Sequence, residues 1–165
     1  MNVYNVLVLG SDSQIAKEIY NRRKKNQKLN YFFLRKKNLD IRSTKDIKKF
    51  IIKRKINILI NCAAFTNVDL AEKNKKKCID INFFAINKLA KLCKVQDIIF
   101  IHFSTDYVFN GKRKTFYNEL CRTNPLNYYG YTKLLADKAI LKIKPRGMII
   151  RTSWVYSQYG NNFVK

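Results

Sequence analysis

Short apolar runs alternate with longer amphipathic segments along the chain. The apolar runs predict five β-strands, over residues 3–9, 31–34, 57–61, 98–103 and 147–151. Apolar residues at helical spacing predict helices over residues 13–25, 43–55, 75–93 and 129–143, with Ser43 capping the second. Near-continuous apolar strands are typical of a parallel sheet covered on both faces. The pattern therefore predicts an α/β domain with a doubly wound parallel sheet and right-handed crossovers.

The length and composition fit a single domain. The chain has 165 residues, 47% of them hydrophobic, which suits one compact domain with one core. No apolar run reaches the roughly 18 residues that would span a bilayer. The residues before Gly10 lack the basic region of a signal peptide, so we expect them to form the first strand. We therefore expect a cytoplasmic protein with no membrane partner.

The net charge of +23 is the most unusual feature of the composition. A charge of this size attracts polyanions at low salt. The basic residues are dispersed over predicted solvent faces and loops, however, without one basic and aromatic stripe. Because Lys, Asn, Ile, Tyr and Phe all have A/T-rich codons, a biased genome also accounts for this composition. We therefore expect no specific nucleic-acid partner.

Four cysteines, Cys62, Cys78, Cys93 and Cys121, lie far apart and form no CxxC pair. This spacing does not match a metal site, and a disulfide framework is not expected in a chain with an ordinary core. We expect the cysteines to be reduced and no metal to be bound.

The candidate chemistry lies after the strands, because sheets of this class bind ligands beyond their carboxyl ends. Gly10 follows the first strand and supplies a tight turn, while Ser13 can cap the next helix and bond a phosphate oxygen. Ser13 and Ala16 stand where a dinucleotide-binding loop usually has its later glycines. A strand, a glycine and a helix follow one another in many α/β proteins. The loop alone therefore leaves a dinucleotide site and a plain structural joint equally open.

Two further strand ends carry candidate cofactor residues. Arg35 follows the second strand, where a carboxylate would suit NADH and a cation suits the 2′-phosphate of NADPH, so it favours NADPH. Asp40 and Ile41 either lie beside the adenine or form a turn before the next helix. The small residues Ala63 and Ala64 follow the third strand. They allow a flat cofactor to pass close to the backbone, or serve close packing of a helix on a strand.

A hydroxyl, a phenol and an amine form the candidate catalytic group. Thr105 follows the fourth strand and would hold a substrate oxygen, and Tyr129 and Lys133 share one face of the predicted fourth helix. An ammonium beside a phenol lowers its pKa from about 10, which would make Tyr129 a proton donor near neutral pH. Tyr20 and Lys24 have the same spacing, so only the position after the Thr105 strand distinguishes Tyr129.

Three residues have a functional and a structural interpretation. Trp154 suits a sugar contact or a core position at a strand end. Asp106 suits substrate orientation or a turn cap. His102 lies within the fourth predicted strand, so we expect a packed core histidine rather than a catalyst.

Five ordered blocks together closely resemble the dTDP-4-dehydrorhamnose reductases of the extended short-chain dehydrogenase/reductase superfamily. They are NCAAFTNVDLAE at 61–72, STDYVF at 104–109, NPLNYYGYTK at 124–133, RTSWVY at 151–156 and GNNF at 160–163. The resemblance implies a Rossmann-like NAD(P)-binding domain over residues 1–165. It also implies reduction of dTDP-4-dehydro-L-rhamnose by NADPH or NADH to dTDP-L-rhamnose, a precursor of cell-envelope polysaccharides.

The same resemblance assigns roles to residues. It makes Thr105, Tyr129 and Lys133 the catalytic set, with Tyr129 protonating the nascent alkoxide. Besides Gly10, Arg35 and Ala63, the residues at cofactor positions are Ser13, Gln14, Ile15, Asp40, Ile41, Ala64, Phe65, Thr66, Phe103, Tyr129 and Lys133. The residues at sugar-nucleotide positions are Thr105, Asp106 and Trp154. A dTDP-sugar is then the expected partner, and a homodimer is compatible with the sequence.

The chain departs from the family pattern in two ways. The later glycines of the loop are replaced, which predicts reduced cofactor affinity. The family also has a C-terminal substrate domain, which we expect to be missing here, so a sheet edge and an unfinished core would be exposed. An inactive remnant or a non-catalytic nucleotide-binding subunit is therefore the alternative to a reductase. A related epimerase or dehydratase is less favoured, because RTSWVY followed by GNNF is closer to the reductase pattern.

Overall fold

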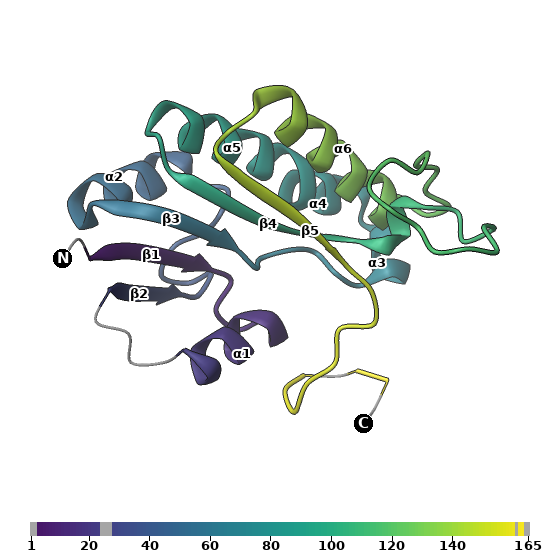
Figure 1. Cartoon of the computed structure of the whole chain (residues 1–165), viewed down its shortest axis with the longest axis horizontal. Coiled ribbons are helices and arrows are strands. Elements are labelled where there is room, and N and C mark those ends of the chain that lie inside the picture. The colour runs from purple at the N-terminus through teal and green to yellow at the C-terminus, as the bar shows by residue number, and fades with distance from the viewer. Residues whose placement is uncertain (1–2, 24–27, 161, 164–165) are drawn as a thin grey trace.

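The computed structural model describes residues 3–23, 28–160 and 162–163. Their strands form one parallel sheet in the order β2-β1-β3-β4-β5 (Figure 1). The strands are β1 (Tyr4–Leu9), β2 (Leu29–Leu34), β3 (Ile56–Asn61), β4 (Ile99–Thr105) and β5 (Gly147–Thr152). The predicted doubly wound parallel sheet is confirmed. Because β2 and β3 lie on opposite sides of β1, the switch point of the sheet falls between β1 and β3.

Helices cover the two faces of the sheet unequally (Figure 1). On one face, α1 (Gln14–Arg22) packs on apolar side chains of β1, β2 and β3. The opposite face carries α2 (Thr44–Arg54), α5 (Ala85–Val95) and α6 (Tyr128–Ile143), which enclose the main core. The predicted residues 24 and 25 of the first helix lie outside the described residues.

The predicted helix over residues 75–93 is interrupted. It consists of α4 (Lys75–Ile79), a π-helical turn at Asp80–Phe84, and α5. Two short elements were not predicted, namely α3 (Val68–Lys73) and a 3₁₀ turn at Asp106–Val108. Ser43 occupies the N-cap position of α2 as predicted, but its hydroxyl lies 2.5 Å from Asp46 Oδ2 and makes no capping bond to the backbone.

The sheet is open at β5. Within the described residues β5 pairs with β4 alone, and the side chain of Met148 on β5 is 57% exposed. Ile101 of β4 pairs with Met148 and is only half-buried. An apolar strand with a free edge is a template for unwanted pairing.

Candidate active site

A pocket of about 490 Å³ opens at the carboxyl ends of β1, β3 and β4. This is the switch-point edge of the sheet, where ligands of such folds bind. The candidate residues that line it are Ser13, Gln14, Ile15, Ala63, Ala64, Thr66, Phe103, Thr105, Asp106, Tyr129, Lys133 and Trp154. The structure thus brings together residues from five separate parts of the sequence.

The loop after β1 has the geometry of a tight turn. Gly10 has φ +76°, and a Cβ at this position would lie 2.6 Å from the backbone of Ala63. Only glycine therefore lets the loop pass the end of β3. Ser13 caps α1 as predicted, because its hydroxyl oxygen accepts a hydrogen bond from Ala16 N at 3.2 Å. The start of α1 consequently faces the pocket with backbone N–H groups available to an anion.

Other predicted cofactor residues lie outside this pocket. Arg35 lines a neighbouring pocket of about 430 Å³, where its Nε lies 3.1 Å from Asp12 Oδ1. Asp40 instead pairs with Arg42 at 2.6 Å, and this hydrogen bond lowers the pKa of the Asp40 carboxyl. Ile41 is buried in the main core, and Phe65 packs against a cluster that includes Tyr129. Cofactor contact by these residues stays a prediction.

Thr105 and Tyr129 meet where β4 ends and α6 begins. The Thr105 hydroxyl lies 3.1 Å from Asp106 Oδ1, and its oxygen accepts from Tyr107 N at 3.2 Å. A Cβ at Gly130 would collide with the carbonyl oxygen of Tyr107, so the glycine lets α6 approach this turn. The approach places Tyr129 within hydrogen-bonding reach of Thr105.

The prediction that Lys133 lowers the pKa of Tyr129 was wrong. Burial raises the pKa of Tyr129 to about 12, and the hydrogen bond with Thr105 opposes this only in part. Lys133 Nζ donates instead to the carbonyl oxygen of Phe103 at 2.6 Å. Burial also lowers the pKa of Lys133 to about 8. Tyr129 is therefore a neutral phenol that keeps a proton to donate.

Trp154 and His102 have distinct environments. Trp154 lines the pocket with 71% of its surface exposed, and its ring meets Phe163 edge-on at 5.1 Å. The core interpretation of Trp154 is thus excluded. His102 is fully buried, as predicted for a core histidine, yet its Nε2 lies only 3.3 Å from Lys133 Nζ.

Comparison with known proteins identifies the family. The family model described as the RmlD substrate binding domain matches residues 4–165. The chain belongs to this family.

Several relatives of this RmlD-family chain are named dTDP-4-dehydrorhamnose reductase. The dTDP-4-dehydrorhamnose reductase of Aggregatibacter actinomycetemcomitans is 32% identical over 97% of the chain and 54% of that protein. The Salmonella typhimurium enzyme of the same name is 37% identical over 76% of this chain and 42% of its own length. A dTDP-4-dehydrorhamnose reductase from Bacillus anthracis has been solved in complex with NADP. Its structure matches with a TM-score of 0.93 at 31% sequence identity, and the match covers 98% of this chain and 57% of the Bacillus anthracis chain. The chain spans about half the length of these relatives.

Two buried asparagines of this RmlD-family chain were not foreseen. Asn82, in the π-helical turn, accepts from Phe65 N at 2.8 Å and donates to Phe65 O at 3.0 Å and Thr132 Oγ1 at 3.2 Å. It thereby fixes the loop after β3 against α6. Asn61 at the end of β3 makes a similar pair of bonds with Ala63. The signal for Asn82 was an amide within the apolar face of a predicted helix.

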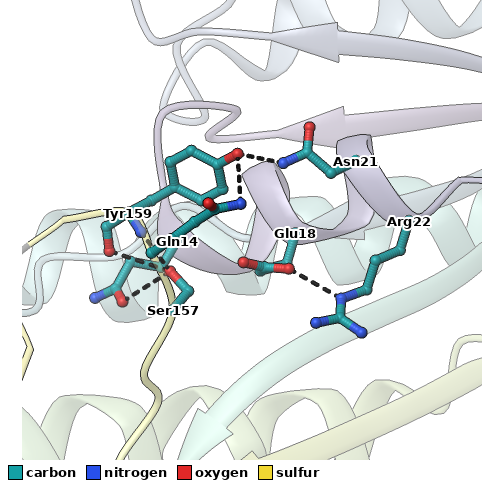
Figure 2. Close-up of polar contacts among 7 residues, drawn as sticks. Gln14, Glu18, Asn21, Arg22, Ser157 and Tyr159 are labelled. Carbon is teal, nitrogen blue, oxygen red and sulfur yellow. Dashed lines mark hydrogen bonds and ion pairs between the residues drawn. The ribbon is translucent and has the colours of Figure 1, made fainter. Parts of the chain in front are cut away.

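The segment after β5 folds back onto α1, which was also not foreseen (Figure 2). The Ser157 hydroxyl lies 3.3 Å from Gln14 Oε1, and Asn21 Nδ2 donates to the Tyr159 hydroxyl. The Lys17 ammonium lies 5.4 Å from the centre of the Tyr159 ring. These contacts place residues 157–159 beside the helix whose first residues line the pocket.

Three further predictions concerned the cysteines, metal binding and the membrane. All four cysteines are free, and Cys62, Cys78 and Cys93 are buried. Within residues 3–23, 28–160 and 162–163, no group of three or more His, Cys, Asp or Glu is arranged to hold a metal ion. No helix in the described part of the chain is long and apolar enough to cross a bilayer.

Proposed function

We propose that this chain carries the cofactor-binding and catalytic part of a dTDP-4-dehydrorhamnose reductase. The reaction is the reduction of dTDP-4-dehydro-L-rhamnose to dTDP-L-rhamnose in nucleotide-sugar biosynthesis. The observation that carries the proposal is a single pocket lined by Thr105, Tyr129 and Lys133 together with the start of α1. The relatives named above are the second support. A cytoplasmic location, a homodimer and the absence of a nucleic-acid partner stay predictions.

The residues of the pocket fit a nicotinamide dinucleotide. The cap at Ser13 and the close approach of Gly10 to Ala63 leave a compact loop before the N–H groups of α1, which suits a pyrophosphate. Arg35 provides a cation near this loop and favours NADPH, in keeping with the NADP complex of the Bacillus anthracis relative. When bound, the reduced nicotinamide supplies a hydride to the 4-keto carbon of the sugar.

The chain's own residues supply the proton and the alignment. The Thr105 hydroxyl holds the keto oxygen near the Tyr129 phenol, which donates its proton to that oxygen as the alcohol forms. Tyr129 leaves this step as a phenolate. Lys133, one helical turn away, stabilises that phenolate when its amine is protonated. Its pKa of about 8 places this protonation close to neutral pH.

Cofactor binding is the first test. Trp154, the single tryptophan of the chain, lines the pocket, so energy transfer from Trp154 to NADPH should report binding. Saturable binding in the micromolar range, followed by NADPH oxidation with dTDP-4-dehydrorhamnose, is expected. A folded chain that binds neither NADPH nor NADH would contradict the proposal.

The non-catalytic alternative makes a different prediction. It is favoured by the replaced glycines of the loop. The substitution Tyr129→Phe distinguishes the two, because it removes one hydroxyl and keeps the ring. A reductase should lose turnover and keep NADPH binding, whereas a binding subunit should show binding without turnover in both proteins.

A further inference from the structure

A second pocket of about 430 Å³ adjoins the candidate active site and is lined by residues of α1 and β2. The two pockets share Asp12, which lies between β1 and α1. The loop after β1 is tied to the end of β2, because Gly10 N and Ser11 N both donate to Leu34 O at 3.1 Å. A dinucleotide that has its nicotinamide beside Tyr129 and crosses the start of α1 therefore directs its adenosine end to the second pocket.

Two cations, Arg35 and Lys17, line this second pocket. Arg35 is paired with Asp12 at 3.1 Å, so these two side chains together carry no net charge. Within the described part of the chain no carboxylate pairs with Lys17, because the adjacent Glu18 pairs with Arg22 at 2.9 Å (Figure 2). The net positive charge of the pocket lining therefore comes from Lys17.

The Tyr159 ring holds the Lys17 side chain at this pocket. The Lys17 ammonium lies 5.4 Å from the ring centre, within the range of a cation–π contact. Tyr159 is itself fixed at both ends, because its backbone N donates to Ser157 Oγ at 3.0 Å and its hydroxyl accepts from Asn21 Nδ2 (Figure 2). The segment after β5 thus determines where a cation of α1 lies.

A phosphate monoester carries about 1.5 to 2 negative charges near neutral pH, which the neutral pair of Arg35 and Asp12 does not offset. We propose that Lys17 is a second binding residue for the 2′-phosphate of NADPH and that Tyr159 is the positioning residue of Lys17. The proposal rests on the function proposed above, since it concerns the adenosine end of the same cofactor. NADH has a hydroxyl in place of this phosphate, so Lys17 discriminates between the two cofactors.

Two adenosine phosphates test the site without a nicotinamide. Adenosine 2′,5′-bisphosphate and adenosine 5′-monophosphate differ only by the 2′-phosphate, so calorimetric titration of the full chain isolates its contribution. The bisphosphate should bind more tightly. Lys17→Met should weaken bisphosphate binding about five- to tenfold and change monophosphate binding by less than about twofold. Equal losses for both compounds, or no loss for either, would overturn the proposal.

Arg22→Met is the matched control for the loss of one positive charge. Arg22 lies on the same helix with its side chain 82% accessible, and it does not line the pocket. Both variants lower the net charge of +23 by one, so a general attraction of anions would fall equally in the two. Arg22→Met should therefore leave bisphosphate binding unchanged. The same weakening in Arg22→Met and Lys17→Met would contradict a specific contact at Lys17.

A double-mutant cycle tests the positioning role of Tyr159. Tyr159→Leu removes the ring and should weaken bisphosphate binding about threefold, whereas Tyr159→Phe keeps the ring and should retain most of the affinity. In the Lys17→Met background, Tyr159→Leu should have no further effect, because the contact that it removes is already lost. A further loss in that background would show that Tyr159 does not act through Lys17.

These titrations separate the proposal from the proposed function. A chain that distinguishes the two adenosine phosphates through Lys17 but oxidises neither NADPH nor NADH would count against the reductase alone. A chain that oxidises both cofactors, with NADPH affinity equal in the wild type and Lys17→Met, would count against the role of Lys17 alone. A folded chain that binds neither adenosine phosphate would also contradict the role of Lys17.

Discussion

Arg151 Nε donates a hydrogen bond to Asp137 Oδ2 at 3.0 Å and so joins β5 to α6. Asp137 is fully buried and follows Lys133 by one helical turn, while Arg151 precedes the segment that contains Trp154. Burial raises the pKa of Asp137, and Arg151 opposes this shift. The pair therefore ties the strand that leads to the pocket rim to the helix that carries the candidate catalytic residues.

Removing Arg151 should be strongly destabilising. Arg151→Met leaves the buried Asp137 carboxylate without its cation, which typically lowers the free energy of unfolding by about 3–5 kcal/mol. Urea denaturation followed by circular dichroism measures this loss. Arg146→Met is the control, because the Arg146–Asp97 pair is exposed, with side chains 64% and 74% accessible, and should contribute less than about 1 kcal/mol. Equal losses in the two variants would refute the structural role of the buried pair.

The contact between Arg35 and Asp12 predicts cofactor preference. Both side chains are more than half exposed, so the pair itself contributes little stability and can exchange partners. A 2′-phosphate beside Arg35 would be attracted by the guanidinium and repelled by the carboxylate. Arg35→Gln should weaken NADPH binding about tenfold with little effect on NADH, and Asp12→Asn should strengthen NADPH binding several-fold. Titrations with both cofactors test this, and equal weakening of the two by Arg35→Gln would contradict it.

Lys133 should make stability depend on pH in the alkaline range. Its pKa is about 8 in the folded chain and 10.5 ordinarily, so between these values the unfolded chain binds a proton that the folded chain does not. Stability relative to Lys133→Met should therefore rise with pH over this window, by up to about 3 kcal/mol. Below pH 8 the wild type should be less stable than Lys133→Met by a constant amount, and above pH 10.5 this difference should disappear. Urea midpoints of both proteins give the difference, in which the titrations of tyrosines and cysteines cancel.

The sheet could be predicted from the sequence because its strands are continuous apolar runs. Val6 and Val8 are buried on the α1 side of the sheet and Leu59 is buried on the other side, so both faces are covered and the strands are apolar throughout. The π-helical turn could not be predicted in this way. Its geometry depends on Asn82, whose partners lie 17 and 50 residues away in the sequence. Periodicity describes one segment at a time and contains no information on such distant bonds.

Many residues that line the pocket were predicted from the sequence, whereas the electrostatics of the pocket were not. The spacing of Tyr129 and Lys133 predicted one shared helix face, and both residues line the same pocket. It could not show that the four-carbon side chain of Lys133 reaches Phe103 O and His102, because those contacts depend on how α6 packs on β4. Burial then raised the pKa of Tyr129 instead of lowering it. Residues that share a helix face can be identified from the sequence, whereas the burial that shifts their pKa values can be known only from the folded structure.

The approach of α6 to the turn after β4 provides a last prediction. An alanine within a helix is usually more stable than a glycine by about 1 kcal/mol. Gly130→Ala should instead destabilise the chain by about 1–3 kcal/mol, because the new methyl group meets the carbonyl oxygen of Tyr107. Relief of this clash would move Tyr129 away from Thr105, so turnover should fall further than NADPH affinity. Gly111→Ala tests the reasoning, since space is open there and only the positive φ of 69° is unfavourable. It should lower stability modestly and leave turnover unchanged, and a similar loss of turnover in both variants would show that the close contact at Gly130 does not position Tyr129.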